Sequence, residues 1–351
     1  MINLTLKEQK IINIILKNKE VQSSVVFKEL IEMGEKASLV TVKRLLSKMV
    51  GLNFLTVSGL GRSVSYRIND EGRLFLEINA QEYCSIELEK RYGLTQYNFN
   101  LFSSIPSNIF NDDELKGLEK ISREYKERVL NLSTTVQKKE LERFVVELSW
   151  KSSRIEGNTY TLLDTERLLL ENKRAVGKTE KEAQMILNHK SAFTFIYNHR
   201  EQFKILTKKN LENLHAILIK DLGVSPGIRK DMVGIMGSTY KPLDNKYQID
   251  DALESLMKVV SRMENPYAKA LISLLGISYV QPFSDGNKRT SRFMANAILL
   301  SYNLLPLSYR NISEDEYREA VLVFYELNSI MPFKKIFLSQ YAFTANNYSI
   351  G

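Results

Sequence analysis

The segment Gln281–Arg292 holds the side chains with the clearest chemistry in this sequence. It reads QPFSDGNKRTSR and lies between two apolar stretches, 272–280 and 293–300, that both predict buried helices. The segment is therefore expected to form a tight turn that ends at the N-terminus of the second helix. Such a terminus presents free backbone N–H groups and a partial positive charge, which together suit a phosphate group. We predict a phosphate-binding turn here.

Individual residues of this turn suit the phosphates of a nucleotide. Gly286 lets the backbone approach an anion closely. Arg289 and Arg292 lie three positions apart, so both can reach the same side of the first helical turn. Each guanidinium can grip phosphate through two parallel hydrogen bonds. Asp285 is a carboxylate beside that anion and is placed to hold Mg²⁺ alongside substrate phosphates.

The turn needs helices on both sides, and most of the chain predicts them. The 351 residues include only 16 glycines and 7 prolines, a composition that favours helix over an all-strand fold. One stretch differs, because Val233–Tyr240 is expected to be a short strand or hairpin arm. Apolar residues at helical spacing predict helices over 70–90, 115–130, 136–155, 179–198, 208–222, 250–263, 267–279, 287–302, 314–328 and 333–346.

The first 70 residues predict a small separate domain. Thr5–Glu8 is a capping-box pattern at the start of a helix, and further helices are expected over Ser24–Met33 and from Ser38. Two strands, 54–57 and 64–68, enclose a glycine-containing turn, so the whole arrangement resembles a winged helix-turn-helix domain. The inward face of the second helix is expected to hold Val26, Phe27, Leu30 and Ile31.

The same region carries much of the positive charge. The chain has 49 basic and 41 acidic residues, a formal net charge of +8, and residues 1–70 hold eleven basic against six acidic ones. Cations beside a helix that enters the major groove neutralise phosphates, so DNA is an expected partner. A three-helix interaction module with solvated lysines is the alternative. The expected contacts are Thr41, Lys43 and Arg44 to bases, Lys48 on the same helix, and Arg62 of the glycine turn to the backbone or minor groove.

The phosphate-binding turn resembles the signature of the Fic family, H-P-F-x-[D/E]-G-N-G-R-x-x-R. Ser152–Asn158 is similar to the family's inhibitory motif, and 226–242 is similar to the flap that holds the target segment. The resemblance covers about 200 residues, roughly 140–345, and implies the mainly α-helical Fido fold with a short β-hairpin flap. The matching positions of the signature are Pro282, Phe283, Asp285, Gly286, Asn287, Arg289 and Arg292.

The resemblance implies transfer of AMP from ATP to a hydroxyl of a protein, with Mg²⁺ held by Asp285. It implies that Arg292 grips the terminal phosphate and that Glu156 pairs with Arg292 to block the productive ATP pose, a workable switch because both acid and anion compete for one cation. The nucleotide would also contact Gly286, Asn287, Lys288 and Arg289 through their backbone N–H groups. The inhibitory residues would be Ser152, Glu156 and Gly157, and the flap residues Ile235, Met236, Gly237 and Tyr240.

Two positions depart from the family pattern. Gln281 stands where the family has the histidine that takes the proton from the attacking hydroxyl, and glutamine has no usable basicity near neutral pH. Loss of a general base typically slows a reaction about 10²–10⁴-fold. Lys288 replaces the usual glycine, as in the Doc branch, which transfers phosphate instead of AMP. The three histidines, His189, His199 and His215, lie outside the motif and are expected to be structural.

These departures leave several functions open. The first is a self-inhibited protein adenylyltransferase, weakened by Gln281, that modifies a protein target or itself. The second is a nucleotide-responsive, DNA-binding transcriptional regulator without catalytic activity. Removal of AMP would need an acid that Gln281 does not supply, and Doc-like phosphate transfer rests on Lys288 alone.

We expect three regions: a winged helix-turn-helix domain over 1–70, a helical linker over 71–135 and a Fic domain with its inhibitory helix over 136–351. The start has no basic segment followed by an apolar one, and no apolar run approaches the roughly 20 residues that span a bilayer, so neither a secretory signal nor a membrane is expected. Cys84 is the single cysteine, which suits a cytoplasmic location. A homodimer is compatible with the sequence.

Overall fold

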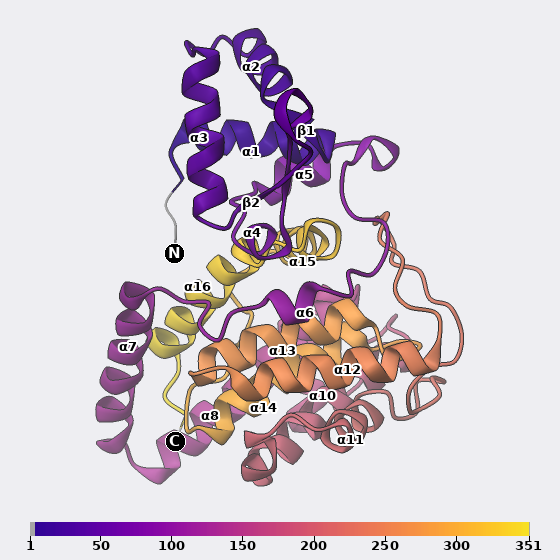
Figure 1. Ribbon diagram of the computed structural model, residues 1–351. Helices are drawn as coiled ribbons and strands as arrows, with labels where there is room; N and C mark the ends of the chain where they lie inside the picture. Colours follow the sequence, from indigo (N-terminus) through magenta and orange to yellow (C-terminus); the bar gives the residue numbers. More distant parts are fainter. Residues whose placement is uncertain (1–3, 351) are drawn as a thin grey trace.

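A computed structural model describes residues 4–350, apart from the side chain of Arg62. Figure 1 shows a small N-terminal module that stands on a larger helical core, with the C-terminal helices α15 (Glu314–Leu327) and α16 (Met331–Asn347) directly beneath the module. In this part of the chain no helix has the length and the apolar character that crossing a bilayer requires.

The N-terminal module consists of three helices and a small antiparallel sheet. The helices are α1 (Leu6–Asn18), α2 (Ser23–Glu32) and α3 (Leu39–Gly51). Strands β2 (Leu55–Ser58) and β3 (Ser65–Ile68) form a hairpin within one residue of the expected positions, and a short β1 (Val21–Gln22) extends the sheet in the order β1-β3-β2. The module has its own hydrophobic core, which includes Ile11, Val26, Leu46, Met49 and Ile68.

The helix starts predicted for α1 and α3 are confirmed. Thr5 and Glu8 form the expected capping box, and Ser38 caps α3. The prediction that Ile31 faces inward is wrong, because its side chain is 46% exposed. Each helical residue turns by about 100°, so Ile31 lies outside the stripe that Val26 and Leu30 define.

The chain that follows the module does not form the single helix expected over 70–90. It forms α4 (Asp70–Leu74), α5 (Ala80–Ser85) and a 3₁₀ turn, η2 (Leu88–Lys90). The interruption has a local cause, since Asn79 accepts a hydrogen bond from the backbone N–H of Glu82 and so starts a new helix.

The core is built around α13 (Pro266–Val280) and α14 (Asn287–Ser301), which are buried along nearly all of their length. Helix α12 (Lys246–Arg262) approaches α13 closely at Gly276, where an added Cβ would lie 2.3 Å from a Leu256 methyl carbon. Figure 1 shows α12, α13 and α14 side by side. The other core helices are α6 (Leu101–Ser104), α7 (Asp112–Leu130), α8 (Thr134–Ile155), α9 (Leu162–Glu171), α10 (Glu180–Asn198), the 3₁₀ helix η3 (Arg200–Lys204) and α11 (Lys208–Leu218).

The segment Val233–Tyr240 is irregular, so the prediction of a strand or hairpin arm there is wrong. A single bridge joins Lys241 to Gln96, with the Lys241 N–H donating to the carbonyl of Thr95 at 2.9 Å. A β-ladder forms only along the continuous edge of another strand. This segment contacts side chains and isolated backbone groups instead, so it does not become a strand. Helix α11 also ends at Leu218, four residues earlier than expected.

One buried carboxylate joins the module, the irregular segment and the core. Glu326, near the end of α15, accepts hydrogen bonds from the Tyr83 hydroxyl and the Ser238 hydroxyl, both at 2.7 Å. The Arg91 guanidinium lies 3.4 Å from the same carboxylate and also donates to the carbonyl of Gly237 at 2.8 Å. Tyr83 belongs to α5, so α15 is tied both to the chain that leaves the module and to the segment 233–240.

Candidate functional site

The predicted phosphate-binding turn connects α13 to α14. Gln281 ends α13 in the left-handed region, with φ of 51°. Gly286 begins α14 with φ of 81°, and a Cβ added there would lie 3.1 Å from Ile219 Cγ2. Both the dihedral and the close contact therefore require glycine at 286. No side chain caps this terminus of α14, so its backbone N–H groups are free to bind an anion.

The side chain of Asn287 holds the turn in shape. Its Oδ1 accepts a hydrogen bond from the Phe283 N–H at 2.9 Å, and its Nδ2 donates to the Phe283 carbonyl at 2.8 Å. Nδ2 also donates to Oε1 of Gln281 at 2.9 Å. Asn287 is buried, so these bonds form in a low-dielectric interior where they are strong. The nucleotide role predicted for Asn287 therefore includes a structural one.

His215 supports the turn from α11. Its ring stacks on Phe283 with a centroid distance of 3.6 Å and an interplanar angle of 3°. Burial lowers the pKa of His215 to about 4, so the ring is neutral near pH 7. We assign the proton to Nε2, because Nε2 lies 3.0 Å from the carbonyl oxygen of Asp285, which can only accept. The expectation that His215 is a packing residue is consistent with this geometry, although the group that it packs against is the predicted phosphate-binding turn.

Arg292 is fully buried and paired with Glu156. Its Nη2 donates to Glu156 Oε1 at 2.8 Å and to the Ser152 carbonyl at 2.9 Å, and its Nε donates to the Ser152 hydroxyl at 3.0 Å. The guanidinium also lies over the ring of Tyr317 at 5.3 Å. Nη1 is buried and makes no hydrogen bond within residues 4–350. One donor of Arg292 thus remains available to a further acceptor.

The electrostatics of this pair favour its charged form. Burial raises the pKa of Glu156, but the cations Arg292, Lys288 and Arg289 outweigh burial, and the net pKa is lowered. For Arg292, burial lowers the pKa, and Glu156 with Tyr317 raises it above its ordinary value. Glu156 and Gly157 follow the end of α8, where Gly157 has φ of 90°. The predicted inhibitory residues Ser152 and Glu156 therefore both contact Arg292.

Asp285 and Arg289 form a second ion pair, on the outer side of the turn. Arg289 Nη2 lies 3.0 Å from Asp285 Oδ2, and the Asp285 side chain is 63% exposed while that of Arg289 is buried. Asp285 Oδ1 accepts the N–H of Gly286 at 2.6 Å. Asp285 is therefore an accessible carboxylate next to the α14 terminus. Mg²⁺ is usually held by one or two carboxylates together with substrate phosphates, so this single residue fits such a role.

Gln281 is held by the turn and by α15. Its amide nitrogen donates to the Ser278 carbonyl at 2.6 Å and lies 3.4 Å from the Tyr325 hydroxyl, while its oxygen accepts from Asn287. The side chain is 7% exposed. The groups that bond this amide are a carbonyl, a phenol and another amide, and none of them is a base near pH 7.

Arg229 and Tyr325 contact the turn, although the sequence reasoning gave neither a role. Arg229 Nε donates to the Gln281 carbonyl at 2.7 Å, and its backbone N–H donates to the Pro282 carbonyl at 3.0 Å. Arg229 lies 52 positions before Gln281 and Tyr325 lies 44 positions after it. No local periodicity relates positions so far apart, and only the family's flap motif, which includes Arg229, could have signalled one of them.

The predicted flap residues have different surroundings. Met236 is 96% exposed and Ile235 is half-buried, whereas Tyr240 is buried and donates its hydroxyl proton to the Tyr279 carbonyl at 2.9 Å. Gly237 has φ of 75° and its carbonyl accepts from Arg91. The structure therefore presents Met236 to solvent and uses Tyr240 as an anchor in the core.

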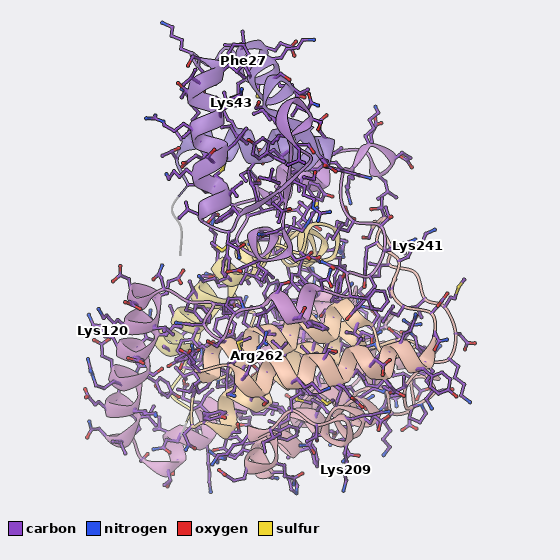
Figure 2. All side chains as sticks on the ribbon, viewed as in Figure 1. Phe27, Lys43, Lys120, Lys209, Lys241 and Arg262 are labelled. Atoms are coloured by element: carbon purple, nitrogen blue, oxygen red, sulfur yellow. The ribbon has the colours of Figure 1, made fainter. Side chains whose placement is uncertain are left out.

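The residues predicted to contact DNA also differ in their surroundings. Lys43 and Arg44 are exposed on α3, and Figure 2 shows Lys43 in the part of the module far from the core. The Thr41 hydroxyl lies 3.0 Å from that of Ser38. Lys48 donates to the buried carboxylate of Glu8 at 2.7 Å, so its charge is partly neutralised within the module. The side chain of Arg62 lies outside the described part of the structure.

Comparison with known proteins agrees with this geometry. A model of the Fic/DOC family matches residues 205–299, which contain α11 to α13, the turn and most of α14. We call residues 205–299 the Fic region because they match this family model. The match explains why the H-P-F-type signature is recognisable in spite of Gln281 and Lys288.

Two curated relatives are similar to part of this chain. "Protein adenylyltransferase Fic" of Nematostella vectensis is 27% identical over 175 residues, which cover 48% of this chain and 41% of the relative. The protein of the same name from Drosophila willistoni is 30% identical over 157 residues, which cover 44% of this chain and 31% of the relative. The chain thus spans less than half the length of these curated relatives.

Solved structures show the same Fic fold. A Fic family protein from Desulfovibrio desulfuricans has a TM-score of 0.57 at 20% identity, over 69% of this chain and 75% of that one. Fic-1 from C. elegans has a TM-score of 0.56 at 20% identity, over 67% of this chain and 70% of that one. A signalling protein with a Fic domain from Bacteroides thetaiotaomicron has a TM-score of 0.55 and is covered over 94% of its length.

Proposed function

We propose that this chain is a self-inhibited Fic-type protein that binds ATP with Mg²⁺ and transfers AMP to a protein hydroxyl, slowly, because Gln281 replaces the base. The observation that carries the proposal is the buried pair Arg292–Glu156 beside an uncapped helix terminus. Arg292 would otherwise hold a phosphate group, and Glu156 occupies it instead. The name of the relatives, protein adenylyltransferase, supports the chemistry.

Different residues of the turn would contact different parts of a bound nucleotide. The N–H groups of residues 287–289 at the start of α14 would bind phosphate oxygens, and that of Gly286 would join them once Asp285 releases it. Arg292 would hold the terminal phosphate once Glu156 moves away. Asp285 would hold Mg²⁺, which neutralises charge on the phosphates when it is bound. Met236 and Ile235 would lie against the target segment. The protein partner is a target hydroxyl, either of another protein or of this chain.

The transfer step would lack a general base. The target oxygen forms a bond to the α-phosphorus, the bond from that phosphorus to the pyrophosphate breaks, and the proton of the hydroxyl must leave. Gln281 does not take that proton at neutral pH, so solvent must receive it. The expected cost is about 10²–10⁴ in rate relative to the same site with a histidine.

Labelling with ATP that carries a tagged α-phosphate, in the presence of Mg²⁺, tests this function. The variants are Glu156→Gln, which removes the competing charge, Gln281→His, and the double variant. Glu166→Gln on α9 is the matched control, because its side chain is exposed. We expect weak labelling in Glu156→Gln, strong labelling in the double variant, and no change in the control. Failure of every variant to label itself or a lysate protein, while ATP still binds, would exclude the transferase.

A second function is favoured by the engaged amide of Gln281 and by the exposed cations of α3. In it, the chain is a catalytically inactive regulator that binds DNA through the N-terminal module, which we interpret as a winged helix, and responds to a nucleotide. A gel-shift assay at two salt concentrations tests it, since phosphate contacts weaken steeply with salt.

The two double variants for that assay each reverse the charge of one lysine and one arginine. We expect the double variant Lys43→Glu with Arg44→Glu to lose DNA binding. The control is Lys120→Glu with Arg123→Glu on α7, where Lys120 lies at one side of the core, away from the module (Figure 2), and it should bind DNA as the parent does. Absence of a shift at low salt, or an equal loss in both double variants, would remove the DNA role.

A further inference from the structure

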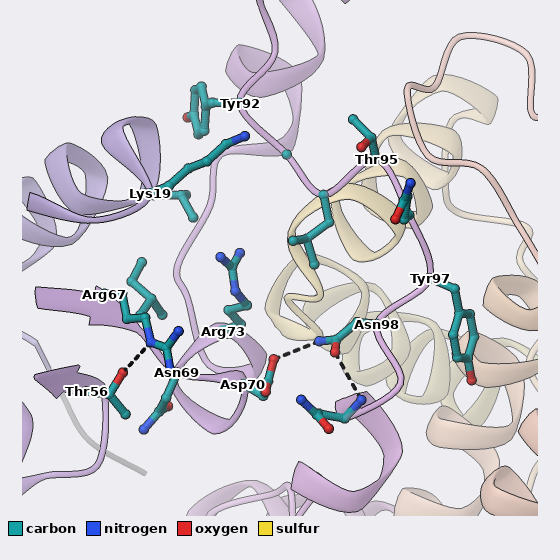
Figure 3. Close-up of a pocket in the computed structure, with 16 residues that line it drawn as sticks. Lys19, Thr56, Arg67, Asn69, Asp70, Arg73, Tyr92, Thr95, Tyr97 and Asn98 are labelled. Carbon is teal, nitrogen blue, oxygen red and sulfur yellow. Dashed lines mark hydrogen bonds between the residues drawn. The ribbon is translucent and has the colours of Figure 1, made fainter. Parts of the chain in front are cut away.

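A cavity of about 610 Å³ lies between the N-terminal module and the chain that leads into the core. One wall comes from the end of α1, the β2–β3 hairpin and α4, and the other from residues 92–98 with Asn100 (Figure 3). The predicted phosphate-binding turn of the Fic region contributes no residue to this cavity. It is therefore a separate site to explain.

Positive charge dominates the lining. Lys19, Arg67 and Arg73 are cationic, and Asp70 is the single acidic residue among the lining residues. Asp70 Oδ1 already accepts a hydrogen bond from Asn98 Nδ2 at 2.8 Å. Arg67 uses its Nε to bond Thr56 Oγ1 at 3.1 Å, which leaves its terminal nitrogens for another acceptor. The cavity thus has more cationic donors than its own residues satisfy.

Arg73 is half-buried and lacks the partners that a cation drawn partly out of water normally has. Its guanidinium points into the cavity on the side of Lys19 (Figure 3) and makes no hydrogen bond within residues 4–350. Desolvation lowers the pKa of Arg73, and Asp70 offsets this only in part. Withdrawing a cation from water is costly unless an anion and hydrogen bonds compensate it. An anionic ligand in the cavity would supply that compensation.

We propose that this cavity binds a small phosphorylated molecule between Arg67, Arg73 and Lys19. Guanidinium groups bind phosphate through paired hydrogen bonds, and an ammonium group adds a point charge. The volume lies in the range of small-molecule sites, roughly 300–1,000 Å³. The site is a cleft between two walls of this chain, which favours a small ligand over a nucleic-acid duplex.

The ligand would contact both parts of the molecule. Residues 92–98 form one wall, and Tyr97 stacks on Tyr279 of α13 with centroids 5.0 Å apart. The backbone N–H of Asn98 donates to the Tyr279 hydroxyl at 2.8 Å. Tyr279 lies two residues before Gln281, so the wall that meets the ligand also packs against the helix that leads into the phosphate-binding turn.

Isothermal titration calorimetry on the full chain tests the proposal with three probes: inorganic phosphate, pyrophosphate and AMP. The variants Arg67→Gln and Arg73→Gln each remove one guanidinium, and Arg123→Gln on α7 is the matched control with an exposed arginine. Loss of a charge-assisted hydrogen bond predicts binding about 10- to 100-fold weaker in the two cavity variants. The control should bind as the parent does. AMP tighter than pyrophosphate would indicate a nucleotide, and the reverse order a ligand without a base.

A further variant separates this cavity from the Fic turn. Arg292→Gln should leave cavity binding unchanged and should weaken only a nucleotide bound at α14. If the probes bind the parent but are lost only in Arg292→Gln, or if no probe binds at all, the proposed site is wrong. Circular dichroism shows whether Arg73→Gln folds, and if it does not, the half-solvated Arg67 decides the question, since its removal leaves no buried group unpaired.

Discussion

At the scale of single residues, the state of the predicted phosphate site depends on whether Arg292 pairs with the Glu156 carboxylate or with a phosphate group. A buried ion pair is a weak source of net stability, but removal of one partner leaves the other charge buried and unpaired. Glu156 therefore stabilises the present arrangement only while Arg292 remains charged beside it. The same property makes Arg292 a good receptor for a phosphate group, because a phosphate can replace the carboxylate as its partner.

The variant Arg292→Ala should abolish nucleotide binding at the turn. It should also lower the free energy of unfolding by about 3–5 kcal/mol, since the Glu156 carboxylate, whose side chain is only 18% exposed, is left without its cation. Calorimetry with ATP and Mg²⁺ measures the first effect and thermal unfolding the second. Arg123→Ala on the exposed face of α7 is the control. ATP affinity equal to that of the parent in Arg292→Ala would contradict the site.

His189 predicts how stability depends on pH. Its ring lies beneath α8, with Nδ1 2.9 Å from the Ser153 hydroxyl, and burial, with Arg289 and Arg292, lowers its pKa to about 3 from an ordinary 6.5. The unfolded chain therefore binds a proton below pH 6.5 that the folded chain does not. Stability from this residue is complete above about pH 6.5 and is lost as the pH falls toward 3, at about 1.4 kcal/mol for each unit of pKa difference.

Urea unfolding at several pH values measures this effect. We expect His189→Gln to flatten the decline in free energy of unfolding between pH 6.5 and 4, whereas His199→Gln, at an exposed position, should leave the slope as it is. Parallel slopes in the parent and in His189→Gln would show that the histidine titrates freely.

At the scale of elements, the α13–α14 turn is determined by backbone geometry as much as by its charged groups. Gly286 has a positive φ and a close neighbour in Ile219. The side chain of Asn287 accepts a hydrogen bond from the Phe283 N–H and so holds the turn in shape. Most helices of this chain start with a side-chain cap, supplied for example by Thr5, Ser38, Asn111, Ser133, Thr179 and Ser313. Helices α2, α6, α14 and α16 start without one, and we assign phosphate binding to the terminus of α14, which follows the turn.

Substitution of glycine tests the turn. Gly286→Ala should lower the free energy of unfolding by about 1–3 kcal/mol, because alanine is strained at this φ and its Cβ meets Ile219. Gly117→Ala on α7 is the matched control, where nothing lies within 4 Å of the added Cβ, and it should raise stability by about 0.5–1 kcal/mol. Chemical denaturation measures both, and two changes of the same sign would contradict the assignment.

At the scale of the whole molecule, Glu326 connects parts of the chain that are far apart in sequence. It bonds Tyr83 after the module, Ser238 and the Thr239 N–H in the irregular segment, and it lies on a core helix. Movement of the module would therefore disturb the segment that carries Met236. The cavity with Arg73 lies at the same junction, between the module and the chain that leads into the core.

Removal of this charge should loosen the junction. In Glu326→Gln we expect faster hydrogen exchange at residues 80–95 and 235–241, because an amide accepts fewer and weaker hydrogen bonds than a carboxylate. Mass spectrometry after deuterium labelling measures the exchange. Glu316→Gln, exposed in the first turn of α15, is the control. Faster exchange throughout the core, with no concentration at these two segments, would show general destabilisation instead.

Sequence alone determined what depends on neighbours along the chain. The capping box at Thr5, the helices on either side of the turn and the hairpin of the module follow from local patterns, and the order of residues in 281–292 was enough to indicate the Fic-type turn. These features need contacts only between residues a few positions apart. The prediction for 70–90 was too long because one asparagine cap interrupts an otherwise helical pattern.

Tertiary structure decided what depends on partners far away in sequence. The irregular course of 233–240, the bonds of Gln281 to Tyr325, the support from Arg229 and the network of Glu326 all join positions tens to hundreds of residues apart. A one-dimensional pattern records which side chains are polar, but not which buried donor meets which acceptor. The same reason applies to the cavity, because Arg67 and Arg73 look like ordinary surface charges until the fold places residues 92–98 opposite them as a second wall.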